Sequence, residues 1–193
     1  MSKEGKTGVT ANTPERILFG AGTIHKGLKY ANGAWNFAET IVCATQGGSE
    51  LAIVPEVYRI EADGASVAVK GLDKKNGEKA TLKIKALEIP ADVLKAALLA
   101  KTGTSEDSNY DLYESKADIV EGDYFENIAF VGKTLKGKNI IAILDNALCI
   151  SGFTLGGENK KETVPELEFE CYADLASDLD TLPWHIYYPK ETA

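Results

Sequence analysis

The chain has 193 residues, of which 44% are hydrophobic and 26% are charged, and its formal net charge is −8. This length suits one domain, and this composition is typical of a globular protein that buries its core without disulfide or metal staples. The acidic balance argues against a protein that holds nucleic acid by its phosphates, because such proteins need a basic patch.

Neither a secretion signal nor a membrane-spanning segment is predicted. The first residues contain no apolar stretch, and no later run approaches 18 apolar residues. Cys43, Cys149 and Cys171 stand in apolar runs without C-x-x-C spacing, which predicts buried, reduced side chains. We therefore expect a protein that folds in a reducing cytoplasm and does not enter a membrane.

The N-terminal part of the chain predicts an arm followed by extended structure. Residues 1–14 are polar and rich in Gly, Thr and Lys, which indicates a disordered arm in the isolated monomer. Residues 16–28 are apolar but broken by glycines, so they are expected to be extended or looped. Residues 39–45 are predicted to form a strand that ends at paired glycines.

Residues 47–72 are predicted to form a long, imperfect hairpin that protrudes from the domain. Asp63-Gly64 lies between two strand-forming runs and predicts the hairpin turn. Pro55 must lie at an edge or a bulge, because proline cannot donate to a strand ladder. The aliphatic residues change face between Ile53 and Tyr58, which predicts a bulge or a sharp twist.

The middle of the chain contains one clear strand and one helix. Asn76-Gly77 predicts a turn, and residues 79–87 then alternate, with Leu82 and Ile84 on the apolar face. Residues 89–100 change to a helical period, with an apolar stripe. That stripe is predicted to comprise Val93, Leu94, Ala97 and Leu98.

An acidic insert at residues 104–126 follows the helix. It holds eight carboxylates and one base, Lys116, and so carries a net charge of −7. Its chemistry suits a solvated loop, or a surface that repels polyanions or binds a basic partner.

The C-terminal third again predicts β-structure. Strand patterns recur at residues 124–135, 139–155 and 165–172, with turns at residues 136–138 and at Gly156-Gly157, and the chain closes in an aromatic extended tail. We predict a mainly β fold, a sandwich or barrel of about seven to eight strands with one flanking helix. Residues 1–193 then form a single domain.

The sequence contains no complete catalytic or cofactor-binding motif. The glycines of GAGTIHKG lack dinucleotide-binding spacing, since His25 occupies the third glycine position, and GKT at residues 132–134 lacks the first glycine of a P-loop. His25 and His185 are far apart in sequence and are expected to be packing or surface residues. The sequence therefore predicts no enzyme, no cofactor and no metal site.

Several stretches together carry a resemblance to a known family. They are GGSELAIVPEVYRIEADG with the following VKGL, then ATLKIKALEIPADVLKAALL, ENIAFVG, NIIAILDNAL and LPWHIYYP. In this order the chain resembles the tail tube (major tail) proteins of long-tailed bacteriophages, over roughly residues 16–189.

The resemblance implies a structural subunit of a virion tail, assembled in the host bacterial cytoplasm. Six subunits would form a ring, and rings would stack into a hollow conduit through which DNA passes without tight binding. The implied partners are further copies of the chain and the tail terminator, tape-measure and tail-tip proteins. Exposed β-edges and flexible arms would serve the interfaces that rings and stacks require.

Two alternatives stay open at this point. Tubes of contractile tails, tailocins and type VI secretion share the implied fold. A β-sandwich binding module for carbohydrate or surface decoration could instead use the aromatic residues Trp35, Phe37, Trp184 and Tyr187. In the tube interpretation, the hairpin supplies the subunit interface. Its expected interface residues are Gly47, Gly48, Pro55, Tyr58, Arg59, Glu61, Asp63 and Gly64.

Overall fold

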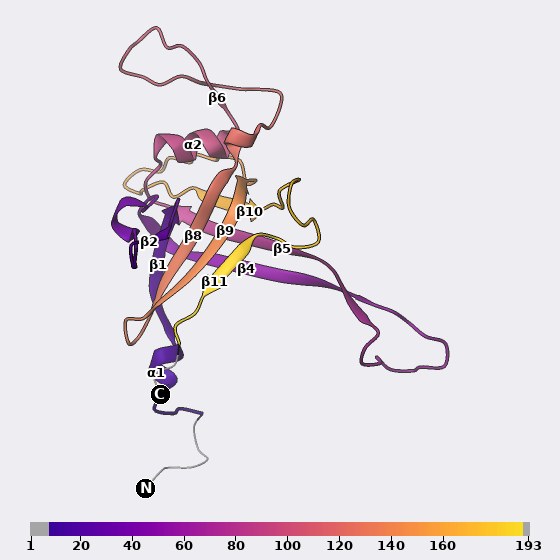
Figure 1. Ribbon diagram of the computed structural model, residues 1–193. Coiled ribbons are helices and arrows are strands. Elements are labelled where there is room, and N and C mark those ends of the chain that lie inside the picture. Colours follow the sequence, from indigo (N-terminus) through magenta and orange to yellow (C-terminus); the bar gives the residue numbers. More distant parts are fainter. Residues whose placement is uncertain (1–7, 191–193) are drawn as a thin grey trace.

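The computed structural model describes residues 8–190 of the chain. Residues 1–7 of the expected N-terminal arm lie outside the described residues. The rest of that segment leads into a single helical turn, α1 (Thr13–Arg16), with Pro14 in its first turn. Proline suits this position because its missing N–H would have no partner within the helix. The chain then enters the sheet at β1 (Leu18–Lys26) (Figure 1).

Seven strands form one antiparallel sheet, which confirms the predicted mainly β fold with about seven to eight strands. The order is β1-β8-β9-β10-β5-β4, and β11 pairs with a part of β9 that β10 does not reach. The strands after β1 are β4 (Thr45–Arg59), β5 (Asp73–Ala86), β8 (Phe125–Thr134), β9 (Asn139–Cys149), β10 (Glu166–Cys171) and β11 (Trp184–Tyr187).

Short elements occupy the connections between these strands. They are β2 (Tyr30–Ala31), β3 (Ala34–Trp35), β6 (Lys101–Thr102), β7 (Tyr113–Glu114) and the 3₁₀ turns η1 (Phe37–Glu39) and η2 (Glu121–Asp123). β2 pairs with β3, and β6 pairs with β7, each pair forming a two-stranded sheet. The tail predicted at the C-terminal end is in fact β11, a strand of the main sheet.

The sheet curls, and residues 39–45 connect its two edge strands. The N–H of Val42 donates to the carbonyl of Ile24 on β1 at 2.9 Å, and the N–H of Leu87, just after β5, donates to Ala44 at 2.8 Å. The continuous strand predicted over 39–45 is wrong, because this segment pairs with β1 only through an isolated bridge between Ile41 and His25 and then crosses to the other edge, where β4 begins at Thr45. Its crossing gives the sheet a barrel-like closure at this end.

The core lies inside the curled sheet. It is formed by the apolar side chains that alternate with polar ones along the strands and point to the inner face of the sheet. Leu82 and Ile84 of β5, together with Leu167 and Phe169 of β10, have no exposed surface. The two strands are direct neighbours, with Phe169 opposite Leu82. Burial of a side chain of this size stabilises the folded state by about 1.5–3 kcal/mol.

The flanking helix α2 (Ala91–Leu98) covers the end of the sheet near the start of β8 (Figure 1). Its presence was predicted, but its buried residues are Val93, Ala96 and Ala97. Leu98, which we expected on the buried stripe, is 47% exposed. The helix is short, and two alanines at the contact let it lie close to the sheet. Its buried face is therefore narrower than the apolar stripe predicted from the sequence.

The long hairpin pairs β4 with β5, not with the predicted return strand at 65–72. Residues 60–72 form a loop, in which Asp63-Gly64 makes a local turn, with Ala65 N–H donating to Ala62 at 3.1 Å. The expected turn at Asn76-Gly77 lies inside β5 as a bulge. A turn and a bulge both need glycine's backbone freedom, so local sequence could not separate them.

Candidate assembly surface

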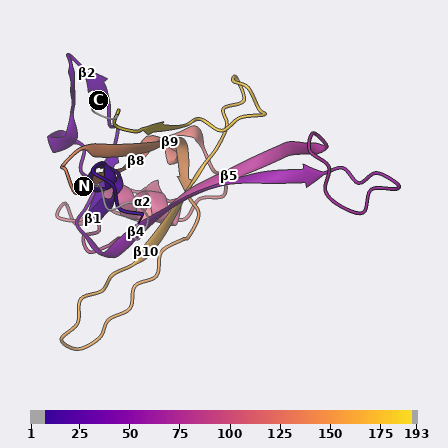
Figure 2. The same cartoon turned by 90° about the horizontal axis from the view of Figure 1, so that it is seen from below.

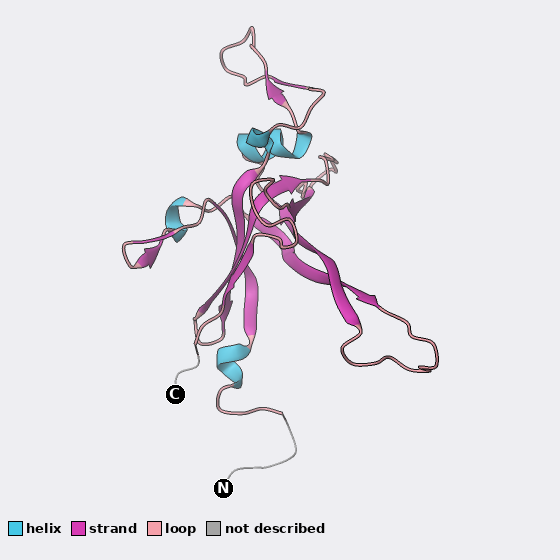
Figure 3. Ribbon diagram, turned by 45° about the vertical axis from the view of Figure 1, so that its right-hand side comes forward, coloured by secondary structure: helices cyan, strands magenta, loops and turns pink. Residues whose placement is uncertain are grey.

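The hairpin formed by β4 and β5 extends well beyond the curled sheet (Figures 1, 2 and 3). Every residue of β4 from Val54 onward is exposed, as are residues 73–76 of β5. Six large hydrophobic side chains on this projection, called here the hairpin surface, face solvent. They are Val54, Val57, Tyr58, Ile60, Val67 and Val69. Exposed apolar patches on soluble proteins typically mark surfaces that another molecule covers.

The edge position predicted for Pro55 is confirmed, because β4 is the last strand of the sheet. Pro55 stands opposite Glu78 in the β4–β5 register. Edge strands leave alternate N–H and C=O groups without a ladder partner, and these groups can pair with another chain. Proline removes one donor, so any added strand would pair on either side of Pro55.

Paired glycines interrupt this edge near the start of β4. The register shifts between Thr45 and Ser49, and Gly47 and Gly48 have φ values of 88° and 89°. A Cβ on Gly47 would also lie 3.1 Å from the Lys85 side chain. The edge is therefore partly protected by a bulge, contrary to the fully exposed edges that we expected.

The predicted change of face between Ile53 and Tyr58 is confirmed. The β4–β5 register shifts between Glu56 and Val57, where Asn76 is the extra residue of β5. A bulge increases the local twist and reorients the following side chains. The far half of the hairpin thereby presents its apolar residues in a different direction from the half that packs on the core.

Glu78 anchors the root of the hairpin to the segment before β11. Its Oε1 accepts the N–H of Leu182 at 3.2 Å, and its Oε2 accepts from Lys75 Nζ at 2.6 Å. The Glu78 side chain is only 6% exposed. The hydrogen bond from Lys75 lowers the pKa of Glu78, with help from the Leu182 N–H and against the effect of burial. The ionised carboxylate therefore holds the root in place.

The eight expected interface residues do not form one compact cluster. Gly47 and Gly48 lie near the start of β4, and Pro55, Tyr58 and Arg59 lie along the projecting part of this strand. The remaining three, Glu61, Asp63 and Gly64, lie in the 60–72 loop. Twelve residues of strand separate Gly47 from Arg59, which corresponds to roughly 40 Å. The hairpin could therefore contact a neighbour over a long, narrow strip.

An aromatic cluster lies on another side of the molecule and was not foreseen. The ring centroids of Trp35 and Tyr187 are 4.9 Å apart, those of Trp35 and Phe37 are 6.3 Å apart, and Tyr30 packs 5.4 Å from Trp35. Three of the four aromatic residues named for a binding module therefore meet, whereas Trp184 packs against the main core. Tyr30 and Tyr187 leave 61% and 49% of their surfaces exposed.

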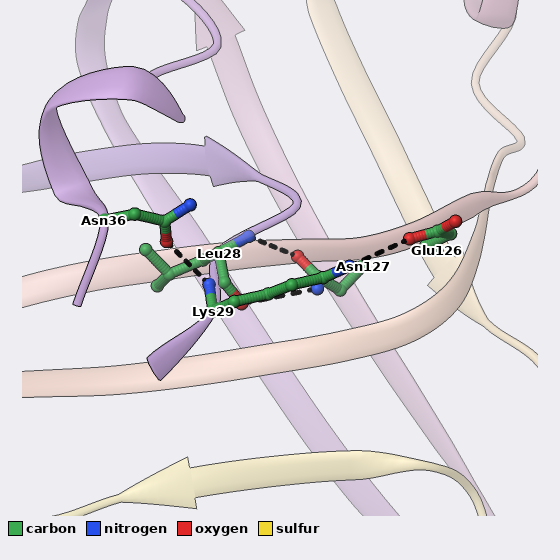
Figure 4. A network of polar contacts seen from close by, with 5 residues as sticks. All are labelled: Leu28, Lys29, Asn36, Glu126 and Asn127. Atoms are coloured by element: carbon green, nitrogen blue, oxygen red, sulfur yellow. Dashed lines mark hydrogen bonds and ion pairs between the residues drawn. The ribbon is translucent and has the colours of Figure 1, made fainter. Parts of the chain in front are cut away.

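A polar network positions the small β2–β3 hairpin that carries this cluster (Figure 4). The buried Asn127 of β8 accepts the N–H of Leu28 at 2.9 Å, and Asn36 accepts the N–H of Lys29 at 2.7 Å. Lys29 Nζ also lies 3.6 Å from Glu126. The sequence signal that would have located this hairpin is Asn-Gly at residues 32–33, both with positive φ.

His25 is buried and fully hydrogen-bonded. Thr40 Oγ1 donates to the Asn36 carbonyl at 2.9 Å, so His25 Nδ1 donates to Thr40 at 2.9 Å, and Nε2 accepts from Thr23 at 2.8 Å. Burial lowers the pKa of His25. A neutral imidazole with both nitrogens occupied by threonines is a packing residue.

The second histidine pairs with a carboxylate near the C-terminal end. His185 Nε2 lies 3.0 Å from Asp145 Oδ2, and burial raises the pKa of Asp145 while His185 opposes that rise. Cys171 donates its thiol hydrogen to the Asp145 carbonyl at 3.1 Å, and burial raises its pKa to about 12. A thiol with a raised pKa forms little thiolate, so it is a poor nucleophile or metal ligand.

The acidic insert is tied down near its C-terminal end. Lys116 pairs with the buried Asp123, whose carboxylate also accepts the N–H of Val120 at 2.8 Å. Burial opposes ionisation of Asp123, but the hydrogen bonds from Lys116 and Val120 outweigh it and lower the pKa. Residues 106–112 are exposed, so the tip of the insert remains solvated.

Within residues 8–190, no group of three or more His, Cys, Asp or Glu side chains is arranged to hold a metal ion. None of the helices in that range is long and apolar enough to cross a membrane. No protein-family model matches the chain, and no curated protein sequence matches it either.

Proposed function

We propose that this chain is the structural subunit of a phage tail tube, in which copies form rings of six and the rings stack into a conduit for DNA. The observation that carries the proposal is the hairpin surface, six exposed hydrophobic side chains on a projection with an open strand edge. A projection of this kind gains burial and backbone pairing only when a neighbouring copy covers it.

The charge of the chain supports the second half of the proposal. A tube that conducts DNA must not retain it, and a net charge of −8 repels phosphates. The partners in such a particle would be further copies of the chain, tail terminator, tape-measure and tail-tip proteins. A tailocin or type VI-like tube would use the same subunit geometry.

The aromatic cluster favours a second candidate, a carbohydrate-binding module. Tyr30, Trp35 and Tyr187 expose an aromatic surface next to polar side chains, and sugars stack on such surfaces. A binding module of this kind does not need to self-associate, whereas a tube subunit does, so self-association distinguishes the two candidate functions.

Sedimentation velocity over a wide concentration range tests both candidates. The tube subunit is expected to be monomeric when dilute and to form ring-sized and larger species when concentrated. A chain that stays monomeric at every concentration and binds glycans on an array would overturn the tube proposal and support the binding module.

A further inference from the structure

The two ends of strand β8 carry opposite charge and lie at opposite ends of the molecule. β8 begins at Phe125, within the last residues of the acidic insert, and ends at Thr134, which leads into the β8–β9 turn. Ten residues of strand span roughly 30 Å. Figure 1 shows the acidic insert beyond α2 at one end and α1 with the β8–β9 turn at the other.

The acidic end consists of two loops that meet in a shallow groove. The insert at 104–126 carries −7, and residues 173–181 add three aspartates without a base. Both loops line the groove, and its apolar side chains are strongly exposed: Ile119 by 51%, Val120 by 53% and Leu175 by 91%. This end therefore combines an apolar floor with an acidic rim.

The basic end gathers α1, the start of β1, the β8–β9 turn and the residues after β11. Lys138 Nζ lies 3.1 Å from Glu15 and donates to the Lys190 carbonyl at 3.3 Å, which holds the three segments together. The described residues of this end include five bases and one acid, Glu15, so they carry a net charge of +4. The bases are Arg16, Lys133, Lys136, Lys138 and Lys190.

Large apolar side chains are exposed at the basic end as well. Phe19 is 70% exposed, Tyr188 56%, Leu135 50% and Leu18 45%. Both ends therefore have an exposed apolar centre, and the charged rims around the two centres have opposite sign, so the two ends are complementary. Interfaces of this composition bury their apolar centre and are oriented by the charges around it.

We propose that the acidic end of one copy docks against the basic end of a second copy of this chain. The contact is heterologous, so it leaves one free end of each kind and repeats into a linear stack. If this contact joins successive rings of a tube, the inference rests on the proposed function. It then adds to that function the polarity of the stack and the residues that set this polarity.

Charge reversal tests this contact without touching the hairpin. Asp118→Lys with Glu121→Lys reverses the acidic end, and Lys133→Glu with Lys136→Glu reverses the basic end. All four side chains are exposed. Each pair alone is expected to weaken self-association at least about tenfold in sedimentation velocity, because like charges then face each other. The two pairs combined in one chain are expected to restore it.

Two controls accompany the reversals. Lys160→Glu with Lys161→Glu makes the same charge change at two exposed positions of the 150–165 loop and is expected to leave association unchanged. Salt is the second control: association of the wild type is expected to weaken as ionic strength rises well above 0.1 M, where the Debye length is about 10 Å. Circular dichroism melts show that each variant is folded before association is compared.

The outcomes separate this inference from the proposed function. Rings or tubes that form equally well in both reversed variants overturn the end-to-end contact and leave the tube proposal standing. Salt-sensitive chains without rings, rescued by the combined reversal, support the contact and overturn the tube. A wild type that remains monomeric at all concentrations overturns both.

Discussion

Pro55 and Glu78 face each other across the β4–β5 ladder at the point where the hairpin leaves the body. Pro55 withholds a backbone donor from the outer edge, while Glu78 reaches back to accept the N–H of Leu182 at 3.2 Å. On one side of this pair the strands pack on the core, and on the other side they are exposed. The pair therefore marks the boundary between the folded domain and the surface proposed for assembly.

The hairpin surface is expected to matter for association and not for folding. Val57→Ser with Tyr58→Ser removes two side chains that are 59% and 60% exposed. We expect the free energy of unfolding of the dilute monomer to change by no more than about 0.5 kcal/mol, as for other surface substitutions. Self-association in sedimentation is expected to be lost.

A matched control for that variant is Leu155→Ser, which changes a side chain that is 66% exposed on the 150–165 loop. It is expected to associate like the wild type. If the Val57/Tyr58 variant also associates normally, the hairpin surface has no role in assembly. If that variant fails to fold, the hairpin belongs to the core of the domain.

Replacing Glu78 by Gln is expected to loosen the root of the hairpin. The exchange removes a charge-assisted bond from Lys75 and weakens the bond from Leu182, at a cost of about 1–3 kcal/mol. Amide hydrogen exchange should accelerate at Leu182 and along β5 near residue 78, while exchange in β8 changes little. Uniform acceleration across all strands would contradict a local anchoring role.

The same residue predicts a pH dependence. The folded-state pKa of Glu78 lies below its ordinary value of 4.5, so the unfolded chain binds a proton more readily. The stability that Glu78 contributes is therefore complete above pH 4.5 and is lost as pH falls through the lowered value. Chemical denaturation at a series of pH values should show a smaller acid loss in Glu78→Gln than in the wild type.

The core is expected to respond very differently from the surface. Phe169→Ala removes a fully buried ring that stacks on Phe125 at 5.4 Å and should destabilise the domain by about 3–5 kcal/mol. Phe19→Ala, at a 70% exposed position, should leave the monomer's unfolding midpoint nearly unchanged. Equal effects of the two substitutions on denaturant midpoints would show that the core is not where we place it.

Part of this structure could be read from the sequence. Strict alternation identified Leu82 and Ile84 as core residues, because a strand with one buried face has a period of two. Pro55 could be assigned to an edge because its missing N–H excludes it from a central strand.

The pairing partner of β4 could not be read in this way. Asp63-Gly64 and Asn76-Gly77 carry equal hairpin signals, and only pairing along the whole length of β4 and β5 decides between turn and bulge. The aromatic cluster was missed for a similar reason, since Trp35 and Tyr187 are distant in sequence and meet through the docking of β11 on β9. Long-range contacts of this kind leave no local pattern.

DNA is expected to bind the protein only weakly. Five of the described bases form a patch of net +4 at one end, while the whole chain carries −8. A gel-shift titration at physiological salt should give no dissociation constant tighter than about 1 μM, the tight limit of ordinary non-specific binding. A complex well below that value would contradict a surface that lets DNA pass.

Electron microscopy of the concentrated protein, negatively stained and then in vitreous ice, tests the central claim most directly. The tube account predicts rings with six-fold symmetry, and stacks of such rings with the β4–β5 hairpin of each subunit buried against a neighbouring copy. Particles of monomer size at every concentration, or assemblies in which the hairpin remains free in solvent, would contradict it.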